Sequence, residues 1–248
     1  MRPRSAPAIF ALLALALWEA IVRIFGIPAY LLPGPVAIAH AFAADPWGLF
    51  LALLSTLMVT AVALAVAALL GAMMALAMDL SPLARAAIQP WAVALQVTPI
   101  VAIAPLIIVL IGNPFVALVA CATIVAFFPV FANTASGLGS APPELADLFH
   151  LYGASRWRTL WLLRVPSALP FFLSGLRISG GLALVGAVVA EFVAGSGGFA
   201  SGLAYRILEA GYRLEIPRMF AAVALLAVAG MAINASLGLL ERVGARRY

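Results

Sequence analysis

Six long apolar stretches divide this chain into membrane-length segments, and they constrain its fold more than any other feature. A helix needs roughly 20 apolar residues to cross a hydrocarbon core of ~30 Å. The stretches cover residues 9–25, 51–78, 86–111, 115–131, 166–193 and 219–240. A chain that is 66% hydrophobic and 9% charged has too few polar residues to cover a water-soluble domain of 248 residues. We therefore expect an all-α integral membrane protein, with a single domain over residues 1–248 and six transmembrane helices.

The polar residues exclude several functions. All fourteen basic residues are arginine, and a Walker A loop needs a lysine to reach nucleotide phosphates, so we expect no ATPase motif in this chain. The arginines are scattered along the sequence, so the net charge of +5 does not indicate nucleic-acid binding. His40 and His150 fall on opposite sides of the membrane in the topology below, so no metal site is expected. No set of catalytic residues can be assembled either.

The distribution of arginines predicts the orientation of the chain, because cytoplasmic loops of membrane proteins are enriched in basic residues. With the N-terminus in the cytoplasm, nine arginines lie inside and four lie outside or near the outer face. The inner set is Arg2, Arg4, Arg85, Arg156, Arg158, Arg164, Arg242, Arg246 and Arg247, and the outer set is Arg23, Arg206, Arg213 and Arg218. We predict that both termini, and the polar interval 140–165 between the fourth and fifth segments, face the cytoplasm.

This polar interval predicts a short amphipathic helix. Pro142 and Pro143 followed by Glu144 are typical of a helix start. Gly153 can take the positive φ that ends a helix, and Ser155 can cap a second one. The apolar face of the first helix consists of Leu145, Leu148, Phe149 and Tyr152. Such a helix can lie on lipid headgroups or enter a groove on a soluble partner, and the residues alone leave both uses open.

The third apolar segment contains Pro90, Pro99 and Pro105, and polar Gln96 and Thr98 lie beside Pro99. Each interior proline removes one backbone hydrogen bond. Irregular backbone at membrane depth is tolerated only where it is surrounded by protein or lines a water-filled cavity. Gln96, Thr98 and Pro99 are therefore candidates for lining a translocation pathway. The alternative is a kink that packs against neighbouring helices.

Two ionisable residues in the fifth segment are further pathway candidates. Arg177 lies ~16 Å along a helix from Pro166, near mid-membrane, where a charge costs ~2.5–3.5 kcal/mol and must face protein or water. It can contact an anionic substrate, or it can bond to the chain's own carbonyls. Glu191 lies ~21 Å further along the same helix, so the two cannot pair. We place Glu191 near an outer gate or as a cap of the turn at 195–198.

Small residues in the fifth segment predict close helix packing. Gly175 and Ser179 are four residues apart, as are Gly186 and Ala190. This spacing places each pair on one helix face, where small side chains let two backbones approach. The pattern indicates packing rather than chemistry.

The run Glu144–Ser155 and the later Leu163-Arg-Val-Pro166 resemble the EAA loop of ABC-importer permeases of the binding-protein-dependent type. The family pattern is Glu-Ala-Ala, three residues, Gly, nine residues, then Ile-x-Leu-Pro. Counting from Gly153 places Asp147, Leu148 and Phe149 on Glu-Ala-Ala, and counting forward places Leu163–Pro166 on Ile-x-Leu-Pro. Large Leu148 and Phe149 replace the two alanines, a departure that bears on the fit to a partner's groove.

The resemblance extends over nearly the whole chain. Leu31-Leu-Pro-Gly-Pro, Pro99 with Pro105-Leu-Ile-Ile, and Gly175-Leu-Arg177 with Ala190-Glu191 are similar to the sulfonate, nitrate and taurine permease subfamily. The stretches Gly202–Arg206 and Ile216–Phe220 are similar to members for pyrimidine-type thiamine precursors.

The resemblance implies a permease subunit of an ATP-driven importer in the bacterial inner membrane, for a small anion or a related small molecule. Two permease subunits, expected to be a homodimer, would form the pathway. Two separate ABC ATPase subunits would use ATP, and an extracytoplasmic solute-binding protein would deliver the substrate. This chain itself would bind lipid and no cofactor. The ATPase-coupling residues would be Glu144, Leu145, Asp147, Leu148, Phe149, Tyr152, Gly153, Ala154, Ser155 and Pro166.

Two other functions compete with this interpretation. An ion-coupled secondary transporter would use intramembrane acids and an internal inverted repeat, but such acids are scarce here and no repeat is visible. A membrane enzyme or scaffold has little support, because the chain offers no catalytic or metal-binding cluster.

Overall fold

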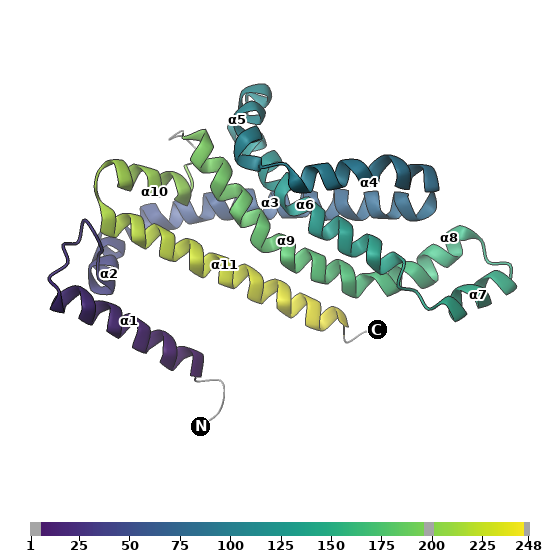
Figure 1. The fold of residues 1–248 in the computed structure, drawn as a ribbon, viewed down its shortest axis with the longest axis horizontal. Coiled ribbons are helices and arrows are strands. Elements are labelled where there is room, and N and C mark those ends of the chain that lie inside the picture. The colour runs from purple at the N-terminus through teal and green to yellow at the C-terminus, as the bar shows by residue number, and fades with distance from the viewer. Residues whose placement is uncertain (1–5, 196–200, 246–248) are drawn as a thin grey trace. The chain divides into compact units, whose positions relative to one another are not determined.

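The computed structural model describes residues 6–195 and 201–245, and within these ranges the chain forms helices and turns with no strand (Figure 1). A five-residue π-helix, Leu160–Arg164, precedes α9. The α-helices are α1 (Ala6–Ile24), α2 (Pro35–Ala44), α3 (Pro46–Leu80), α4 (Pro82–Val97), α5 (Ile100–Ile111), α6 (Pro114–Leu138), α7 (Pro143–Leu151), α8 (Arg156–Thr159), α9 (Val165–Ala194), α10 (Leu203–Tyr212) and α11 (Ile216–Ala245). The predicted all-α fold is confirmed.

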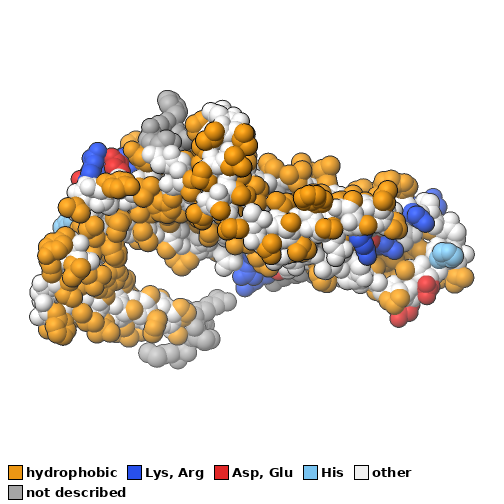
Figure 2. Space-filling view, turned by 45° about the horizontal axis from the view of Figure 1, so that its top comes forward, with side chains coloured by type: hydrophobic (Ala, Val, Ile, Leu, Met, Phe, Trp, Pro, Cys, Tyr) orange, Lys and Arg blue, Asp and Glu red, His pale blue; other side chains and the backbone are white. Residues whose placement is uncertain are grey.

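Five helical runs in the described ranges are long and apolar enough to cross a membrane. They are α1, α3, α6, the continuous run Arg156–Ala194 and most of α11. The pair α4 and α5 makes a sixth when the two are counted as one span. Figure 2 shows hydrophobic side chains over much of the visible helix surface, as contact with lipid requires. Four arginines in the topology count, Arg2, Arg4, Arg246 and Arg247, lie outside the described residues.

The third segment is two helices rather than one kinked helix. The axes of α4 and α5 are bent by 105°. Pro90 and Pro105 remain inside their helices, and only Pro99 coincides with the break. Thr98 has φ −77° and ψ 122°, the extended conformation that a following proline favours. Whether a proline separates two helices therefore depends on its position in the segment rather than on the number of prolines.

Several of the described helices run beyond the predicted apolar segments. For example, α6 continues from Phe131 to Leu138 through a polar stretch. Thr134 donates its hydroxyl hydrogen to the Val130 carbonyl (2.6 Å), and Asn133 donates to the Pro129 carbonyl (2.8 Å). Because these polar groups form hydrogen bonds within their own helix, the helix continues past the point where the sequence becomes less apolar.

The chain divides into two compact units, and the first comprises residues 1–55 and 195–228. An ion pair joins Asp45 to Arg218 within this unit. The carboxylate of Glu19 in α1 accepts a hydrogen bond from the backbone N–H of Val36 at the start of α2 (3.1 Å). The buried core of the unit consists of Leu49, Ala52, Leu203, Ala221 and Ala222.

The second unit comprises residues 56–194 and 229–248 and contains the predicted site residues. Its centre is the contact between α6 and α9. Phe127 and Phe131 stack in a buried cluster on α6, with ring centroids 5.4 Å apart. Ser179 on α9 is fully buried and donates its hydroxyl hydrogen to the Ala126 carbonyl (2.6 Å).

The small residues of α9 let it approach α6 closely, as predicted. A Cβ atom added at Gly175 would lie 2.7 Å from the Pro129 carbonyl oxygen. One added at Gly186 would lie 2.9 Å from the Cα atom of Ala122. Both distances are too short, and the atoms met belong to backbone that cannot rotate away. Gly181 on the same helix has open space at this position.

We expect Gly175→Ala to destabilise the protein and Gly181→Ala to leave it unharmed. The added methyl at 175 must push α6 and α9 apart, and overpacking of this kind costs about 1–3 kcal/mol. At 181 the methyl meets nothing, and alanine favours a helix over glycine by about 1 kcal/mol. Thermal unfolding of the two variants in the same detergent measures the difference. Equal melting temperatures would show that the close α6–α9 contact is absent.

Candidate functional site

Helix α7 lies in the first half of the polar interval and begins and ends where the sequence predicted. Pro142 precedes its first residue, Pro143, and Glu144 lies in its first turn. Figure 2 shows charged and histidine side chains gathered at the end of the molecule where α7 lies. The predicted apolar face is largely unburied: Leu148 is 45% exposed and Tyr152 is 84% exposed. The described part of the chain therefore leaves much of this apolar helix face exposed.

A glycine turn ends α7 and directs the chain into α8. Gly153 has φ +66° and donates its N–H to the His150 carbonyl (3.0 Å). Ala154 donates its N–H to the Phe149 carbonyl (2.9 Å). This pair of bonds is the Schellman motif, which requires a left-handed residue at the position of the glycine. Ser155 then caps α8, and its hydroxyl accepts the N–H of Arg158 (3.3 Å).

A π-helical turn lies between α8 and Pro166, the second residue of α9. Val165 donates its N–H to the Leu160 carbonyl, five residues back. Pro166 has no N–H for an α-helical bond, and its ring crowds the preceding turn. The wider π-helical turn accommodates this proline within a continuous helical run. The sequence predicted a helix start at Pro166 and gave no sign of the π-helix.

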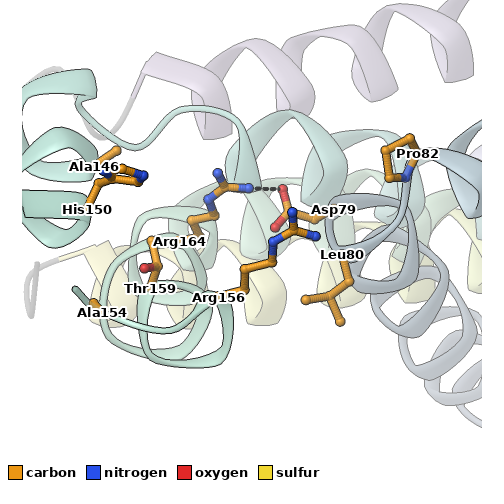
Figure 3. A pocket seen from close by; sticks show the side chains of 9 residues that line it. All are labelled: Asp79, Leu80, Pro82, Ala146, His150, Ala154, Arg156, Thr159 and Arg164. Atoms are coloured by element: carbon orange, nitrogen blue, oxygen red, sulfur yellow. Dashed lines mark hydrogen bonds and ion pairs between the residues drawn. The ribbon is translucent and has the colours of Figure 1, made fainter.

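An ion pair ties this π-helix to the end of α3. The guanidinium of Arg164 donates to a carboxylate oxygen of Asp79 (2.6 Å), and the Asp79 side chain is only 9% exposed (Figure 3). A cavity of about 400 Å³ lies beside the pair. Its walls come from three places: the α3–α4 junction with Asp79, α7 with His150, and the run from α8 to the π-helix with Arg156 and Arg164 (Figure 3).

Two of the three pathway candidates at the α4–α5 break line a second cavity. Gln96 and Thr98 line a space of about 260 Å³ together with residues of α6 and α9. Thr98 donates its hydroxyl hydrogen to the Ala94 carbonyl (2.6 Å). Pro99 is the first residue after the break and precedes α5.

Arg177 is held by polar side chains of α11. Its Nε donates to Asn234 Oδ1 (3.0 Å), and its Nη1 donates to Glu241 (3.0 Å). Ser174 donates its hydroxyl hydrogen to the other oxygen of the same carboxylate. The sequence anticipated backbone carbonyls or a substrate as partners, whereas the observed partners are side chains. Arg177 remains 42% exposed, so its charge is paired but accessible.

Glu191 is buried and does not lie with Arg177. It is 3% exposed and accepts a hydrogen bond from the hydroxyl of Thr56 (2.9 Å). Thr56 is itself fully buried on α3, so the bond links two helices. The predicted cap on the turn at 195–198 falls on residues outside the described ranges, apart from Gly195.

Sequence reasoning missed the partners of these charges. Asp79 and Glu241 each lie directly after an apolar segment, where a charge needs no special explanation, and Asn234 is an uncharged residue within the last segment. Their partners are 85, 57 and 64 residues away in the chain. One signal could have indicated that Asp79 and Glu241 have partners. A carboxylate that is partly buried near the end of a segment requires a cation or a polar group beside it.

Comparison with known proteins now identifies the chain. Residues 67–248 match the family described as binding-protein-dependent transport system inner membrane component. The chain belongs to this family. It is therefore a transmembrane permease subunit of an ABC importer rather than an enzyme, and it resides in the inner membrane as a multi-pass protein. Permeases of this family work with an ATPase and a solute-binding protein.

Curated permeases align along nearly the whole chain. The formylaminopyrimidine transport permease protein ThiX of Halalkalibacterium halodurans is 33% identical, over 96% of this chain and 93% of its own length. The riboflavin transport system permease protein RibX of Chloroflexus aurantiacus is 34% identical over 94% of this chain and 86% of its own. The putative aliphatic sulfonates transport permease protein SsuC of Bacillus subtilis is 29% identical over 92% and 82%. The predicted relation to both branches is confirmed.

A solved permease has the same fold. A chain from the crystal structure of an amino acid ABC transporter with histidines aligns with a TM-score of 0.66, over 81% of this chain and 96% of that one. The sequence identity is 20%, so the likeness bears on the helical arrangement alone.

Proposed function

We propose that this permease forms the membrane pathway of an importer for a small organic or inorganic anion or a pyrimidine-like molecule. Relatives of 29–34% identity are named for sulfonates, riboflavin and formylaminopyrimidine, which supports a small-molecule substrate. Two copies of the chain form the pathway, and an extracytoplasmic binding protein delivers the substrate. Both termini and α7 face the cytoplasm, in keeping with the arginine distribution. ATP is used only by the partner ATPase.

The exposed apolar face of α7 is the observation that carries the coupling role. Leu145, Leu148 and Tyr152 are exposed on a nine-residue helix that lies between two membrane-length helices. An amphipathic helix of this kind enters a hydrophobic groove on a partner. Each of two ATPase subunits receives one α7 in our proposal, and closure of the ATPases moves the helices and rocks the transmembrane segments between two states.

The bonds that connect α7 to its neighbours support the transmission of force. The coupling residues from Glu144 to Ser155 lie on α7 and its Schellman turn, and Pro166 lies beside the π-helix that Asp79 holds through Arg164. Motion of α7 therefore reaches α3 and α9 through one ion pair and one continuous helix. Arg177 is already paired with Glu241, so we assign it a structural role. We keep Gln96, Thr98 and Pro99 as proposed pathway residues, because Gln96 and Thr98 line the second cavity and Pro99 lies at the break beside it.

We expect Leu148→Glu to release the ATPase. Burial of a leucine at an interface contributes about 1.5–3 kcal/mol, and a carboxylate in an apolar groove adds a desolvation cost. Recovery of the ATPase with the affinity-tagged permease from detergent extracts should fall at least tenfold. Leu214→Glu is the matched control, since Leu214 is 75% exposed and lies between α10 and α11, on the outer face in this topology. Equal ATPase recovery with both variants would overturn the docking role of α7.

A further inference from the structure

The break between α4 and α5 leaves backbone polar groups without helical partners. Helix α4 ends at Val97, and Pro99 has no N–H to donate to the Leu95 carbonyl. Among the described residues, no backbone N–H donates to the carbonyls of Leu95, Gln96 or Val97. The 105° bend carries α5 away, so its N–H groups do not continue the ladder (Figure 1). The three carbonyls are therefore free acceptors.

The cavity beside this break lies at the middle of the neighbouring spans. Its wall on α6 runs from Ile124 to Pro129, and α6 itself extends from Pro114 to Leu138. The wall therefore begins ~15 Å from the start of a helix that is ~37 Å long, at ~1.5 Å per residue. At this depth water is scarce, and free carbonyls are tolerated only beside a wet or ligand-filled space.

The lining combines hydrogen-bonding groups with apolar surface and carries no charge. Gln96 contributes an amide that both donates and accepts, and no hydrogen bond to this amide occurs within the described part of the chain. Phe128 and Leu182 provide aromatic and aliphatic walls. None of the described residues that line the cavity is charged. The volume of about 260 Å³ is below the ~300–1,000 Å³ of pockets for drug-sized ligands, so the occupant is small.

These features select among the substrate classes of the proposed function. An anion in this cavity would lose its hydration without meeting a cation, which is strongly unfavourable. Arg177, the cation on α9, is already bonded to Asn234 and Glu241. An uncharged ring with N–H donors and ring-nitrogen acceptors would instead satisfy both the Gln96 amide and the free carbonyls, and its flat face would pack on Phe128.

We propose that the cavity at the α4–α5 break is a substrate-binding site for an uncharged, single-ring nitrogen heterocycle, with Gln96 as the residue that reads its edge. This inference rests on the proposed function, because it takes the α4–α5 break as part of the import pathway. It goes beyond that function because it assigns a substrate-binding site to the membrane subunit itself. This site would select substrates independently of any binding protein.

Equilibrium dialysis tests the site without a binding protein. The full-length permease, purified with its ATPase in lipid nanodiscs, is equilibrated with a radiolabelled 4-aminopyrimidine, with methanesulfonate as the competitor. We expect saturable binding that methanesulfonate does not displace. Gln96→Leu, which keeps the side-chain size but removes the amide, should weaken binding about tenfold. Gln96→Asn should fall between the two. Val93→Ala, on the same helix but outside the cavity lining, should bind like the wild type.

The outcomes separate this inference from the proposed function. The amount of ATPase in each nanodisc sample reports assembly directly. If the ATPase is present but the wild type shows no saturable binding, the site is wrong and the coupling role stands. Equal binding by Gln96→Leu and wild type, or full displacement by methanesulfonate, also overturns the site. If the ATPase is absent from the wild-type sample, the proposed function itself fails.

Discussion

Permease carrying Gly153→Val should lose ATP-driven uptake completely, and Gly153→Asn should retain most of it. The backbone at this position has φ +66°, which costs an ordinary L-residue about 1–2 kcal/mol and is worse for a β-branched side chain. Asparagine tolerates the same conformation. No atom lies within 4 Å of an added Cβ atom, so the two variants differ in backbone preference rather than in steric fit.

The expected loss is large because α7 is too short to hold its shape alone. Nine residues form a marginal helix in water. If valine forces the backbone out of the left-handed region, the N–H groups of Gly153 and Ala154 leave their carbonyl partners on α7. The helix end then unwinds and the apolar face turns away from its partner. Uptake and ATP hydrolysis by reconstituted transporters measure the effect together. Equal uptake by the valine and asparagine variants would show that coupling does not depend on this turn.

The membrane fold was predictable because it depends on local composition. Each span is recorded in a long, mostly apolar run of the sequence, so no knowledge of its neighbours is needed. The turn after α7 was predictable for the same reason: Gly153 and Ser155 act on backbone groups within three to five residues. The EAA-like spacing then joined these local features to a function, and the family match bears out that function.

The break at Pro99 shows the limit of local reasoning. Pro90, Pro99 and Pro105 have the same intrinsic effect on a helix, yet only one of them separates two helices. Which proline breaks the helix depends on the packing of α6 and α9 around it, including the cavity next to Gln96. Such information is spread over segments that are distant in the chain. The sequence could therefore name the candidates at the break but not decide between a packed kink and an open lining.

Long-range ion pairs were beyond the sequence for a similar reason. The sequence pattern places Arg164 among the cytoplasmic charges and in the EAA-like motif, and it gives no role to Asp79, which follows the second apolar segment. Nothing in either neighbourhood indicates that they meet across 85 residues. For Arg177 the sequence offered a substrate or backbone carbonyls as partners, and Asn234 and Glu241 could not be chosen from among the other polar residues.

Reversing the charge of Arg164 should uncouple the transporter, and reversing both members of the pair should restore part of its activity. In Arg164→Glu, the new carboxylate faces the carboxylate of Asp79, whose side chain is largely buried. Loss of one partner of a buried pair costs about 3–5 kcal/mol, and we expect ~2 kcal/mol here because Arg164 is partly exposed. The π-helix then separates from the end of α3, so motion of α7 no longer reaches the membrane helices. Uptake should fall at least tenfold while the ATPase stays bound.

The double variant Asp79→Arg/Arg164→Glu decides whether the pair itself matters. It re-forms an ion pair of reversed polarity, so uptake should recover well above that of Arg164→Glu, as a double-mutant cycle requires for residues in contact. Arg158→Glu is the control for charge alone, since Arg158 lies on α8 and no ion pair to it occurs within residues 6–195 or 201–245. Uptake by the double variant no better than by Arg164→Glu, with the control active, would mean that Asp79 and Arg164 act separately. The connection from α7 to the membrane helices would then run through the continuous helix from α8 to α9 alone.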